Sequence, residues 1–353
     1  MNTRVAVIGA GAWGTAVAKI VADKGNDVSI WSYETETVED INTNHRNERF
    51  LPGVTLPANL CASADALACV EGADFIILAA PSLFLERTVK GILESPVVKE
   101  GKAVIGIITK GFIPSPGGPR LIVETLEGVL PSSYKGALVY ISGPSHAEEV
   151  ATGKVTGLIA ASENAKNSIR FRELLTSSRI LVFSSLDVRG VQVCAATKNV
   201  VAVVFGMLDA LKESGGMGDM FGDGTESLLL AAGLNEIQTL GHALGATHPE
   251  TFSSIAGVGD LDVTCRSKFG RNRRFGQDIM RKDIIGPYKD LDDLITHIGD
   301  IGYLPEGAVA CKYAKKLADR HHLKLTITDG LYRILNKEIK PLEFLNLLVK
   351  DLG

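Results

Sequence analysis

The sequence lacks a long uninterrupted apolar run. Its longest candidate, residues 200–208, is followed directly by Asp209 and falls short of the roughly 18–20 residues that span a bilayer. We therefore expect no membrane insertion.

Cysteine is scarce and is not arranged for metal binding. The five cysteines are widely spaced, with no Cys-x-x-Cys pair and no histidine at metal-ligand spacing from any of them. This pattern predicts that the protein binds no metal. It favours five reduced thiols in a reducing compartment, and hence a cytoplasmic protein.

A strong charge of either sign is also missing. Lys and Arg number 37 against 41 Asp and Glu, which gives a formal net charge of −4. One basic cluster, residues 266–274, has almost no interleaved aromatic residues, so we expect no nucleic-acid partner. The 45% hydrophobic content is typical of a globular chain, and 353 residues favour two domains.

Short apolar runs alternate with helix-period segments through the first half of the chain. Such alternation favours a doubly wound parallel sheet. The expected strands are residues 5–8, 28–31, 75–78, 104–108 and 138–141, and the expected helices include 15–23, 86–93 and 121–126. Residues 159–160 and 180–183 are expected to add edge strands.

The rhythm changes after about Asp187, where helical spacing dominates. Segments with this spacing are residues 200–212, 227–244, 308–318 and 342–349, with polar connections at 214–224 and 282–293. The fold class is therefore α/β. We expect a Rossmann-type domain over residues 1–188, followed by an all-helical substrate and catalytic domain over residues 189–353.

A glycine-rich turn follows the first expected strand. Gly9-Ala-Gly11-Ala12-Trp13-Gly14 places three glycines where a strand passes into a helix. The first permits a tight turn, the second lets backbone approach a pyrophosphate, and the third packs helix against strand. A glycine turn without a ligand is the alternative, but the strand-to-helix context favours a dinucleotide site.

The end of the second strand bears on the choice of dinucleotide. No Arg, Lys or His stands between Trp31 and Thr37, where a protein that binds NADP usually carries a basic residue. Glu34 is acidic and suited to the ribose hydroxyls, unless it lies too far along the chain. We therefore expect NAD rather than NADP.

The glycine motif together with Lys198-Asn199 resembles the NAD(P)-dependent glycerol-3-phosphate dehydrogenase family. The resemblance runs nearly end to end, with further motifs in the family's order. These are Ile41-Asn42 with His45 and Asn47, Phe50-Leu-Pro-Gly53, Pro81-Ser82 with Phe84, Thr109-Lys110-Gly111, Ser142-Gly143-Pro-Ser145-His146-Ala147, Gly257-Val-Gly-Asp260 with Thr264-Cys265, and Gly270-Arg271-Asn272-Arg273.

The resemblance implies a reaction and a setting. The expected reaction interconverts dihydroxyacetone phosphate and sn-glycerol 3-phosphate with NADH and NAD, and supplies glycerol 3-phosphate for phospholipid synthesis. A homodimer is a family expectation. The chain departs from the family at Gly224, Glu226 and Ala232-Gly233, and it carries an insertion at residues 212–220. These departures bear on substrate fit and loop closure.

Two lysines are candidates for the chemistry. Reduction of a ketone builds negative charge on its oxygen, which must receive a proton, and Lys198 is the expected general acid. Its apolar neighbours argue against a solvated helix lysine. Lys110, after the strand at residues 104–108, could polarise the same oxygen, or it could be an ordinary surface lysine. Asp260 would hold Lys198 or accept a hydroxyl proton, unless it is a cap residue.

Substrate-binding residues follow from side-chain chemistry and from the resemblance. Asn199 and Thr264 suit substrate hydroxyls, or they are turn or cap residues. By resemblance, Arg271 and Asn272 grip the phosphate, which fits the match of guanidinium to phosphate oxygens. Gly143 and Ser145 join this set by resemblance.

The cofactor set is also taken from the resemblance. Trp13 and Phe84 would pack on the adenine or nicotinamide side, although Phe84 could be plain core. Ala147 would offer a backbone amide. The full cofactor-binding set is Gly9, Gly11, Ala12, Trp13, Gly14, Tyr33, Phe84, Lys110, Ala147, Arg271 and Glu306.

Two other functions remain open from the sequence. A β-hydroxyacid dehydrogenase shares this domain organisation but places a Lys and an Asn four residues apart on one helical face. Here Lys198 and Asn199 are adjacent, which counts against it. A catalytically silent NAD sensor would be expected to lack Lys110 or Lys198, and both are present.

Overall fold

The computed structural model describes residues 2–268 and 270–351 and divides the chain into two compact units. The first comprises the residues up to Ile113 together with Arg120–Val188, and the second comprises Pro114–Pro119 together with the residues from Arg189 onward. Within the second unit, the Arg320 guanidinium donates a hydrogen bond to the Gly117 carbonyl.

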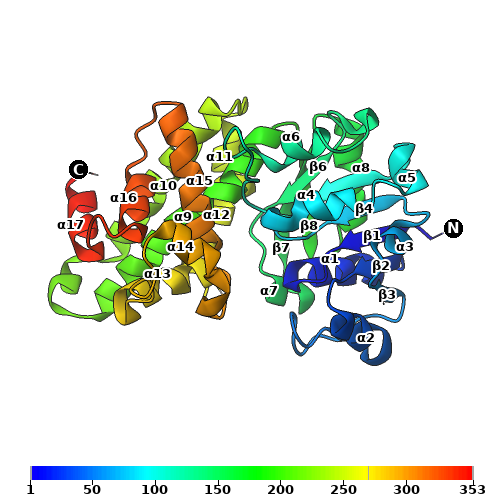
Figure 1. The fold of residues 1–353 in the computed structure, drawn as a ribbon, viewed down its shortest axis with the longest axis horizontal. Coiled ribbons are helices and arrows are strands. Elements are labelled where there is room, and N and C mark those ends of the chain that lie inside the picture. Colours follow the sequence, from blue (N-terminus) through cyan, green and yellow to red (C-terminus); the bar gives the residue numbers. More distant parts are fainter. Residues whose placement is uncertain (1, 269, 352–353) are drawn as a thin grey trace. The chain divides into compact units, whose positions relative to one another are not determined.

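The first unit is built on an eight-stranded sheet in the order β3-β2-β1-β4-β5-β6-β7-β8. Figure 1 labels most of these strands and the helices that connect them. The strands are β1 (Arg4–Ile8), β2 (Asp27–Trp31), β3 (Leu60–Ser63), β4 (Phe75–Leu78), β5 (Val104–Ile107), β6 (Val139–Ser142), β7 (Thr156–Ala161) and β8 (Ile180–Ser185). Strands β1 to β6 pair in parallel, β7 runs antiparallel to β6, and β8 runs parallel to β7. The predicted α/β fold with a Rossmann-type sheet is confirmed.

The interior strands read as uninterrupted apolar runs because both of their faces are covered. Every residue of β4, β5 and β6 is buried. The five predicted strands are present to within about one residue. Strand β3 was not predicted, since its sequence Leu-Cys-Ala-Ser is short and half exposed.

The expectation of two added edge strands is half wrong. Residues 159–160 belong to β7, which lies inside the sheet between β6 and β8. Of the two segments, only residues 180–183 lie in an edge strand, β8. The error has a physical reason: the apolar run at residues 159–160 is short, and the neighbours of a strand in a sheet come from other segments of the chain, here β6 and β8.

Helices connect the strands of the first unit. They are α1 (Ala12–Asp23), α2 (Thr35–Asn44), α3 (Ala66–Val70), α4 (Ser82–Lys90), α5 (Pro96–Lys99), α6 (Ile122–Glu127), the 3₁₀ turn η1 (Ser132–Tyr134), α7 (Ala147–Ala151) and α8 (Ala165–Leu175). Helix α1 begins at Ala12 rather than at the predicted residue 15, so the glycine motif supplies its first turn.

In the described part of the second unit the elements are helical. They are α9 (Val188–Glu213), η2 (Gly216–Met220), α10 (Asp223–Ala243), α11 (Glu250–Ser253), η3 (Ile255–Gly259), α12 (Asp260–Arg266), α13 (Arg271–Lys282), α14 (Leu291–Thr296), η4 (Ile298–Ile301), α15 (Glu306–Arg320), α16 (Thr326–Leu335) and α17 (Pro341–Asp351). The predicted helical C-terminal region is confirmed. The connection predicted at residues 214–224 contains η2 and the start of α10.

Helix α9 is the central element of the second unit. It starts twelve residues before the predicted segment and spans 26 residues. By length and composition the helix could cross a membrane. This was not anticipated from the sequence, because only the apolar run at residues 200–208 was considered. The apolar window of the helix is wholly buried inside the protein, as in the core helix of a folded domain.

Candidate active site

The glycine turn of the first unit is fixed by backbone contacts. Gly9 has φ +128°, and a Cβ on it would lie 2.8 Å from the Ala80 nitrogen. A Cβ on Gly14 would lie 2.0 Å from the Gly9 carbonyl oxygen. Around Gly11, by contrast, there is open space within 4 Å. Two glycines therefore hold the turn together, and the middle one leaves room for a ligand.

Helix α1 directs its first amides at this open space. Its N-cap is Gly11, no side chain caps the first turn, and that turn contains no acidic residue. The first N–H groups of a helix have no partner within the helix, and the helix dipole favours an anion there. The turn can hold a pyrophosphate.

Two polar residues that sequence reasoning missed support the turn from beneath. The buried Asn47 amide donates to the Ala10 carbonyl and to the Thr15 hydroxyl, both at 2.8 Å. The Thr15 hydroxyl donates to the same carbonyl at 3.2 Å. Asn47 stands in one of the family-like motifs, so a signal was available, but its partner lies 37 residues away.

The other cofactor candidates of this unit follow the ends of parallel strands. Tyr33 follows β2, Phe84 lies on α4 after β4, and Lys110 follows β5. Carboxyl ends of parallel strands lie at one edge of a sheet, which is where ligands bind in this architecture. Tyr33 is 80% exposed and Phe84 is 59% exposed, so Phe84 is not plain core. Lys110 is partly buried.

The segment after β6 also reaches this edge. Gly143 has φ +123°, and a Cβ on it would lie 2.7 Å from the Gly157 carbonyl oxygen, so only glycine fits. The Ser145 hydroxyl donates to the Gly143 carbonyl at 3.2 Å. Ala147 is the first residue of α7.

At the end of β2, the Ser32 hydroxyl donates to the Glu34 carboxylate at 3.1 Å.

The second unit carries a buried ion pair. Lys198, in the middle of α9, is 5% exposed and donates to the carboxylate of Asp260, which is 0% exposed. Burying a single charge is costly, and each of these charges offsets the cost of the other. A solvated helix lysine is therefore the wrong description of Lys198. Asp260 pairs with it from the first turn of α12.

A π-helical turn brings Asp260 to this place. The turn η3 precedes α12, and a Cβ on Gly257 would lie 2.0 Å from the Phe252 carbonyl oxygen. The Ser254 hydroxyl accepts from the Ala256 amide at 3.1 Å and fixes the start of the turn. Thr264, one turn beyond Asp260, donates its hydroxyl to the Asp260 carbonyl at 2.5 Å. The Thr264 oxygen keeps acceptor capacity.

The remaining candidates of the second unit form a connected group. The Asn199 amide donates to the Glu306 carboxylate at 3.5 Å, and the Arg271 guanidinium lies 4.0 Å from the same carboxylate. The buried Asn272 accepts from the Gly307 amide at 2.7 Å through its side-chain oxygen. The Arg271 side chain is exposed at the N-terminus of α13.

Three glycines let α13 and α15 touch the backbone of α9. A Cβ on Gly206 would lie 1.9 Å from the Arg273 carbonyl, and a Cβ on Gly276 would lie 1.9 Å from the Val203 carbonyl. A Cβ on Gly307 would lie 2.6 Å from the Asn199 carbonyl. Sequence reasoning did not single out these glycines, because a helical glycine at a helix crossing has no local signature.

The thiols are poorly suited to chemistry. All five cysteines are free, and only Cys61 is exposed. Burial raises the pKa of Cys69 to about 11, and it raises the pKa of Cys265 further, beside the lysine–aspartate pair. Since the thiolate is the reactive form, these buried cysteines act as small apolar residues.

Where the chain departs from the resembled family, Glu226 is buried and ion-paired. It accepts from Lys212 and Arg266, so the inserted segment at residues 212–220 is tied to α10 and α12. Gly224 is exposed with open space around its Cα, and Gly233 packs on Val201.

Two features define a class of protein. One is a glycine turn on a sheet in which β1 lies next to β4, and the other is a lysine paired to an aspartate in a helical unit. The class is the two-domain oxidoreductases that use a nicotinamide dinucleotide. The chain belongs to the NAD-dependent glycerol-3-phosphate dehydrogenase family. Residues 4–168 match the family's N-terminal part, and residues 187–346 match its C-terminal part.

Individual relatives cover the whole chain. A glycerol-3-phosphate dehydrogenase [NAD(P)+] of Treponema denticola is 56% identical over 99% of both chains. One from Bacillus velezensis is 34% identical over 94% of this chain and 90% of its own. The crystal structure of glycerol-3-phosphate dehydrogenase from Coxiella burnetii superposes with a TM-score of 0.83 at 31% identity, over 99% of both chains.

These findings confirm the family, the enzyme class and NAD dependence. The chain is an oxidoreductase of glycerol 3-phosphate, and the relatives' names allow NADP beside NAD. A D-mandelate dehydrogenase with a TM-score of 0.57 and 12% identity shares the fold alone. The β-hydroxyacid alternative is set aside because both parts of the chain match the glycerol-3-phosphate dehydrogenase family.

Proposed function

We propose that this chain reduces dihydroxyacetone phosphate to sn-glycerol 3-phosphate, with Lys198 as the general acid. When bound at the glycine turn, NADH supplies the hydride to the ketone carbon. The carbonyl π bond opens, and the Lys198 ammonium delivers a proton to the oxygen, which becomes the new hydroxyl. In the oxidation direction the neutral amine takes that proton back.

The observation that carries this proposal is the buried pair of Lys198 and Asp260. A charged amine inside a helical core is costly unless it has a partner, and chemistry is a reason to retain such a pair. Asp260 orients the amine and holds its charge. Lys110 supplies a second cation to the ketone oxygen.

The phosphate is assigned to the start of α13. There the Arg271 guanidinium and the first amides of a 12-residue helix offer donors to an anion. Asn272 adds its side-chain NH₂, since its oxygen is already bonded to Gly307. Asn199, Thr264, Gly143 and Ser145 are assigned to the remaining polar groups of the substrate.

Most of the cofactor-binding candidates belong to the first unit. The pyrophosphate of the cofactor would lie over Gly11 and the first turn of α1, where Gly9, Ala12, Trp13 and Gly14 form the wall. Tyr33, Phe84, Lys110 and Ala147 are the further candidates of this unit, and Arg271 and Glu306 are those of the second unit. NAD is preferred over NADP because residues 31–37 carry no cation, while Glu34 would repel a 2′-phosphate.

The roles of the two domains and the cellular setting are also part of the proposal. Residues 1–188 are assigned to cofactor binding and residues 189–353 to substrate binding and catalysis. The enzyme supplies glycerol 3-phosphate for phospholipid synthesis in the cytoplasm, and its working form is a homodimer. A silent NAD sensor is not favoured, because both lysines are present.

One assay tests the reaction. Purified protein is mixed with NADH and dihydroxyacetone phosphate, and absorbance at the NADH band is followed. We expect oxidation of NADH, slower oxidation of NADPH, and none with a β-hydroxyacid and NAD. NAD binding without turnover of either substrate would select the sensor, and a strong NADPH preference would reject the cofactor assignment.

The role of Lys110 has its own readout. A cation near Lys198 lowers the pH at which that amine loses its proton. In Lys110→Ala, we expect kcat to fall and the alkaline limb of the pH–kcat profile to move to higher pH. A profile that keeps its alkaline limb, with kcat unchanged, would leave Lys110 as an ordinary surface lysine.

A further inference from the structure

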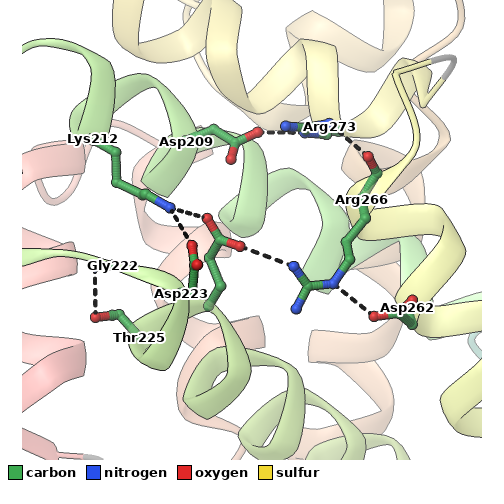
Figure 2. Close-up of polar contacts among 9 residues, drawn as sticks. Asp209, Lys212, Gly222, Asp223, Thr225, Asp262, Arg266 and Arg273 are labelled. Atoms are coloured by element: carbon green, nitrogen blue, oxygen red, sulfur yellow. Dashed lines mark hydrogen bonds and ion pairs between the residues drawn. The ribbon is translucent and has the colours of Figure 1, made fainter.

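A charge network in the second unit surrounds the junction of α12 and α13. Figure 2 shows Lys212, Asp209 and Asp223 on one side and Arg266, Asp262 and Arg273 on the other, joined by hydrogen bonds and ion pairs. The residues come from α9, α10, α12 and α13. None of them is in the catalytic, substrate or cofactor sets above.

Glu226 is the buried centre of this network. It is 7% exposed, and it accepts from Lys212 through one oxygen and from Arg266 at 3.1 Å through the other. The hydrogen bond that Lys212 donates to the Glu226 carboxylate raises the pKa of Lys212. A buried carboxylate with two cationic partners fixes the positions of both, because moving either would leave its charge uncompensated.

Arg266 passes this constraint to the end of α12. Its guanidinium also donates to Asp262 at 2.8 Å and lies 5.8 Å from the centre of the Phe205 ring on α9. Its own backbone carbonyl accepts from Arg273 at 2.8 Å. Arg266, the last residue of α12, is therefore held by its contacts with α9, α10 and α13 and by Asp262 of its own helix.

Arg273 continues the chain of contacts into α13. Its guanidinium pairs with Asp209 on α9, which also accepts from Gln277 at 3.2 Å. Arg273 is two residues beyond Arg271 and one beyond Asn272. Whatever fixes Arg266 and Arg273 therefore fixes the first turn of α13, where the phosphate is assigned.

The opposite end of α12 is held independently. Asp260 is anchored by Lys198 and by the close approach of Gly257 to Phe252. Loosening Glu226 would therefore shift the start of α13 while leaving the lysine–aspartate pair in place. Substrate binding and proton transfer should respond differently.

We propose that Glu226 is a positioning residue, which sets the placement of Arg271 and Asn272 for the substrate phosphate through Arg266 and Arg273. It touches no substrate itself. The proposal rests on the phosphate assignment of the proposed function. The sequence differs from the family at Glu226, and the proposal gives this residue a role in substrate affinity.

The primary test compares Glu226→Gln with Asp223→Asn. Both changes remove one carboxylate partner of Lys212, but the Asp223 side chain is 98% exposed and 3.4 Å from the amine. In Glu226→Gln we expect the KM for dihydroxyacetone phosphate to rise about tenfold, as misplacement of a binding group weakens binding. The kcat and the KM for NADH should stay close to wild type, while the melting temperature should fall because Lys212 and Arg266 lose their buried partner. Asp223→Asn should change none of these quantities.

A double variant separates positioning from a structural role. If Glu226 acts through the phosphate-binding residues, Glu226→Gln should add less than its own tenfold effect to the loss of kcat/KM in Arg271→Ala, because only Asn272 is left for it to place. Multiplicative losses in the double variant, or a fall in kcat alone, would overturn the proposal. A normal KM in folded Glu226→Gln would overturn it as well.

Failure of the phosphate assignment gives a different result. If Arg271→Ala leaves the KM for dihydroxyacetone phosphate unchanged, the proposed function is wrong at that residue and Glu226 loses its target. Should Glu226→Gln not fold, Arg266→Lys replaces it, since lysine keeps the charge but cannot reach Glu226 and Asp262 together. We then expect a smaller rise in KM, and an unchanged KM would count against the proposal.

Discussion

The two units build their parts of the candidate site in different ways. In the first unit the site is made of backbone: glycines 9, 14 and 143 sit against main-chain atoms, and the aromatic candidates Tyr33 and Phe84 are exposed. In the second unit it is made of side chains on helices, with Lys198 and Asp260 buried as an ion pair. One unit presents amides to an anion, and the other holds charge for chemistry.

This difference predicts two kinds of sensitivity. A site made of backbone responds to added volume, because a methyl group in the wrong place moves the main chain. A site made of buried charge responds to neutralisation, because removing one partner leaves the other without compensation. Variants in each unit should therefore fail in different assays.

The largest effect is expected for Lys198→Ala. Loss of the general acid should lower kcat by roughly a thousandfold, while NADH binding, measured by fluorescence titration, stays close to wild type. Lys316→Ala, an exposed lysine on α15, is the matched control and should keep full activity.

The fold of this variant needs its own control. Lys198→Ala leaves Asp260 buried without its partner, so Lys198→Ala/Asp260→Asn, which removes both charges, should recover stability but not activity. Appreciable turnover in the folded double variant would show that another group delivers the proton.

A paired change in the glycine turn gives the next effect. Gly14→Ala places a methyl group 2.0 Å from the Gly9 carbonyl, so α1 must move and the Kd for NADH should rise about a hundredfold. Gly11→Ala meets no protein atom within 4 Å, so the fold should be intact. Its methyl group would lie in the ligand space, and we expect a Kd about tenfold higher.

The pair is read by calorimetry and by NADH titration. Equal melting temperatures for Gly14→Ala and wild type would contradict the close contact. Undiminished NADH affinity in Gly11→Ala would place the pyrophosphate elsewhere and would remove the contrast between the two units.

Arg271→Ala is expected to act on substrate binding. Loss of a charged hydrogen bond to phosphate should raise the KM for dihydroxyacetone phosphate about thirtyfold, with a smaller change in kcat. Arg271→Lys keeps the charge but lacks the two parallel donors of the guanidinium. Its KM for dihydroxyacetone phosphate should lie between those of wild type and Arg271→Ala. A larger effect on NADH affinity than on substrate KM would reassign Arg271 to the cofactor.

The smallest effect concerns stability rather than activity. Glu236 on α10 accepts from the Ile327 amide at 2.5 Å, the Thr328 amide at 3.1 Å and the Thr328 hydroxyl at 2.9 Å, at the start of α16. Burial raises the pKa of its carboxyl from 4.5 to about 7. A raised acid pKa stabilises the fold below the unfolded value and loses that contribution as pH rises toward the folded value.

We therefore expect part of the stability to be lost between about pH 4.5 and pH 7. In Glu236→Gln this part should be absent, and the difference in melting temperature between pH 5 and pH 8 should shrink by about 5 °C. Activity at pH 7 should not change. An identical pH dependence in the variant and wild type would argue that the carboxyl titrates normally.

Much of the first unit was predictable from local patterns. Strand β1, the glycine turn and α1 are contiguous, so period, glycine spacing and order along the chain identify them together. Strand β3 was not predicted because its four residues, of which only Leu60 is buried, form no apolar run. The place of β7 inside the sheet escaped because it depends on which strands become neighbours.

Less of the second unit was predictable. Helical spacing predicted segments that overlap α9, α10, α15 and α17 but did not predict α11, α12, α14 or α16. Family-like motifs pointed to Lys198, Asp260 and Arg271. The supports of that site were not visible: Gly206 and Gly276 look like ordinary helix residues, and only their contacts with α13 and α9 explain them. The starts of α9 and α10 were missed for the same reason, since packing extends helices beyond their local signals.

The amino-acid order alone determined the fold class, the glycine turn, the family and the residue types available for the reaction. Those properties depend on residues that are close together along the chain. Only the tertiary structure decided which charged residues form ion pairs. Lys198 and Asp260 are 62 residues apart along the chain, and Glu226 and Arg266 are 40 residues apart. Burial and helix crossings make those pairs, because the strength of a charge interaction depends on distance and on solvent rather than on position along the chain.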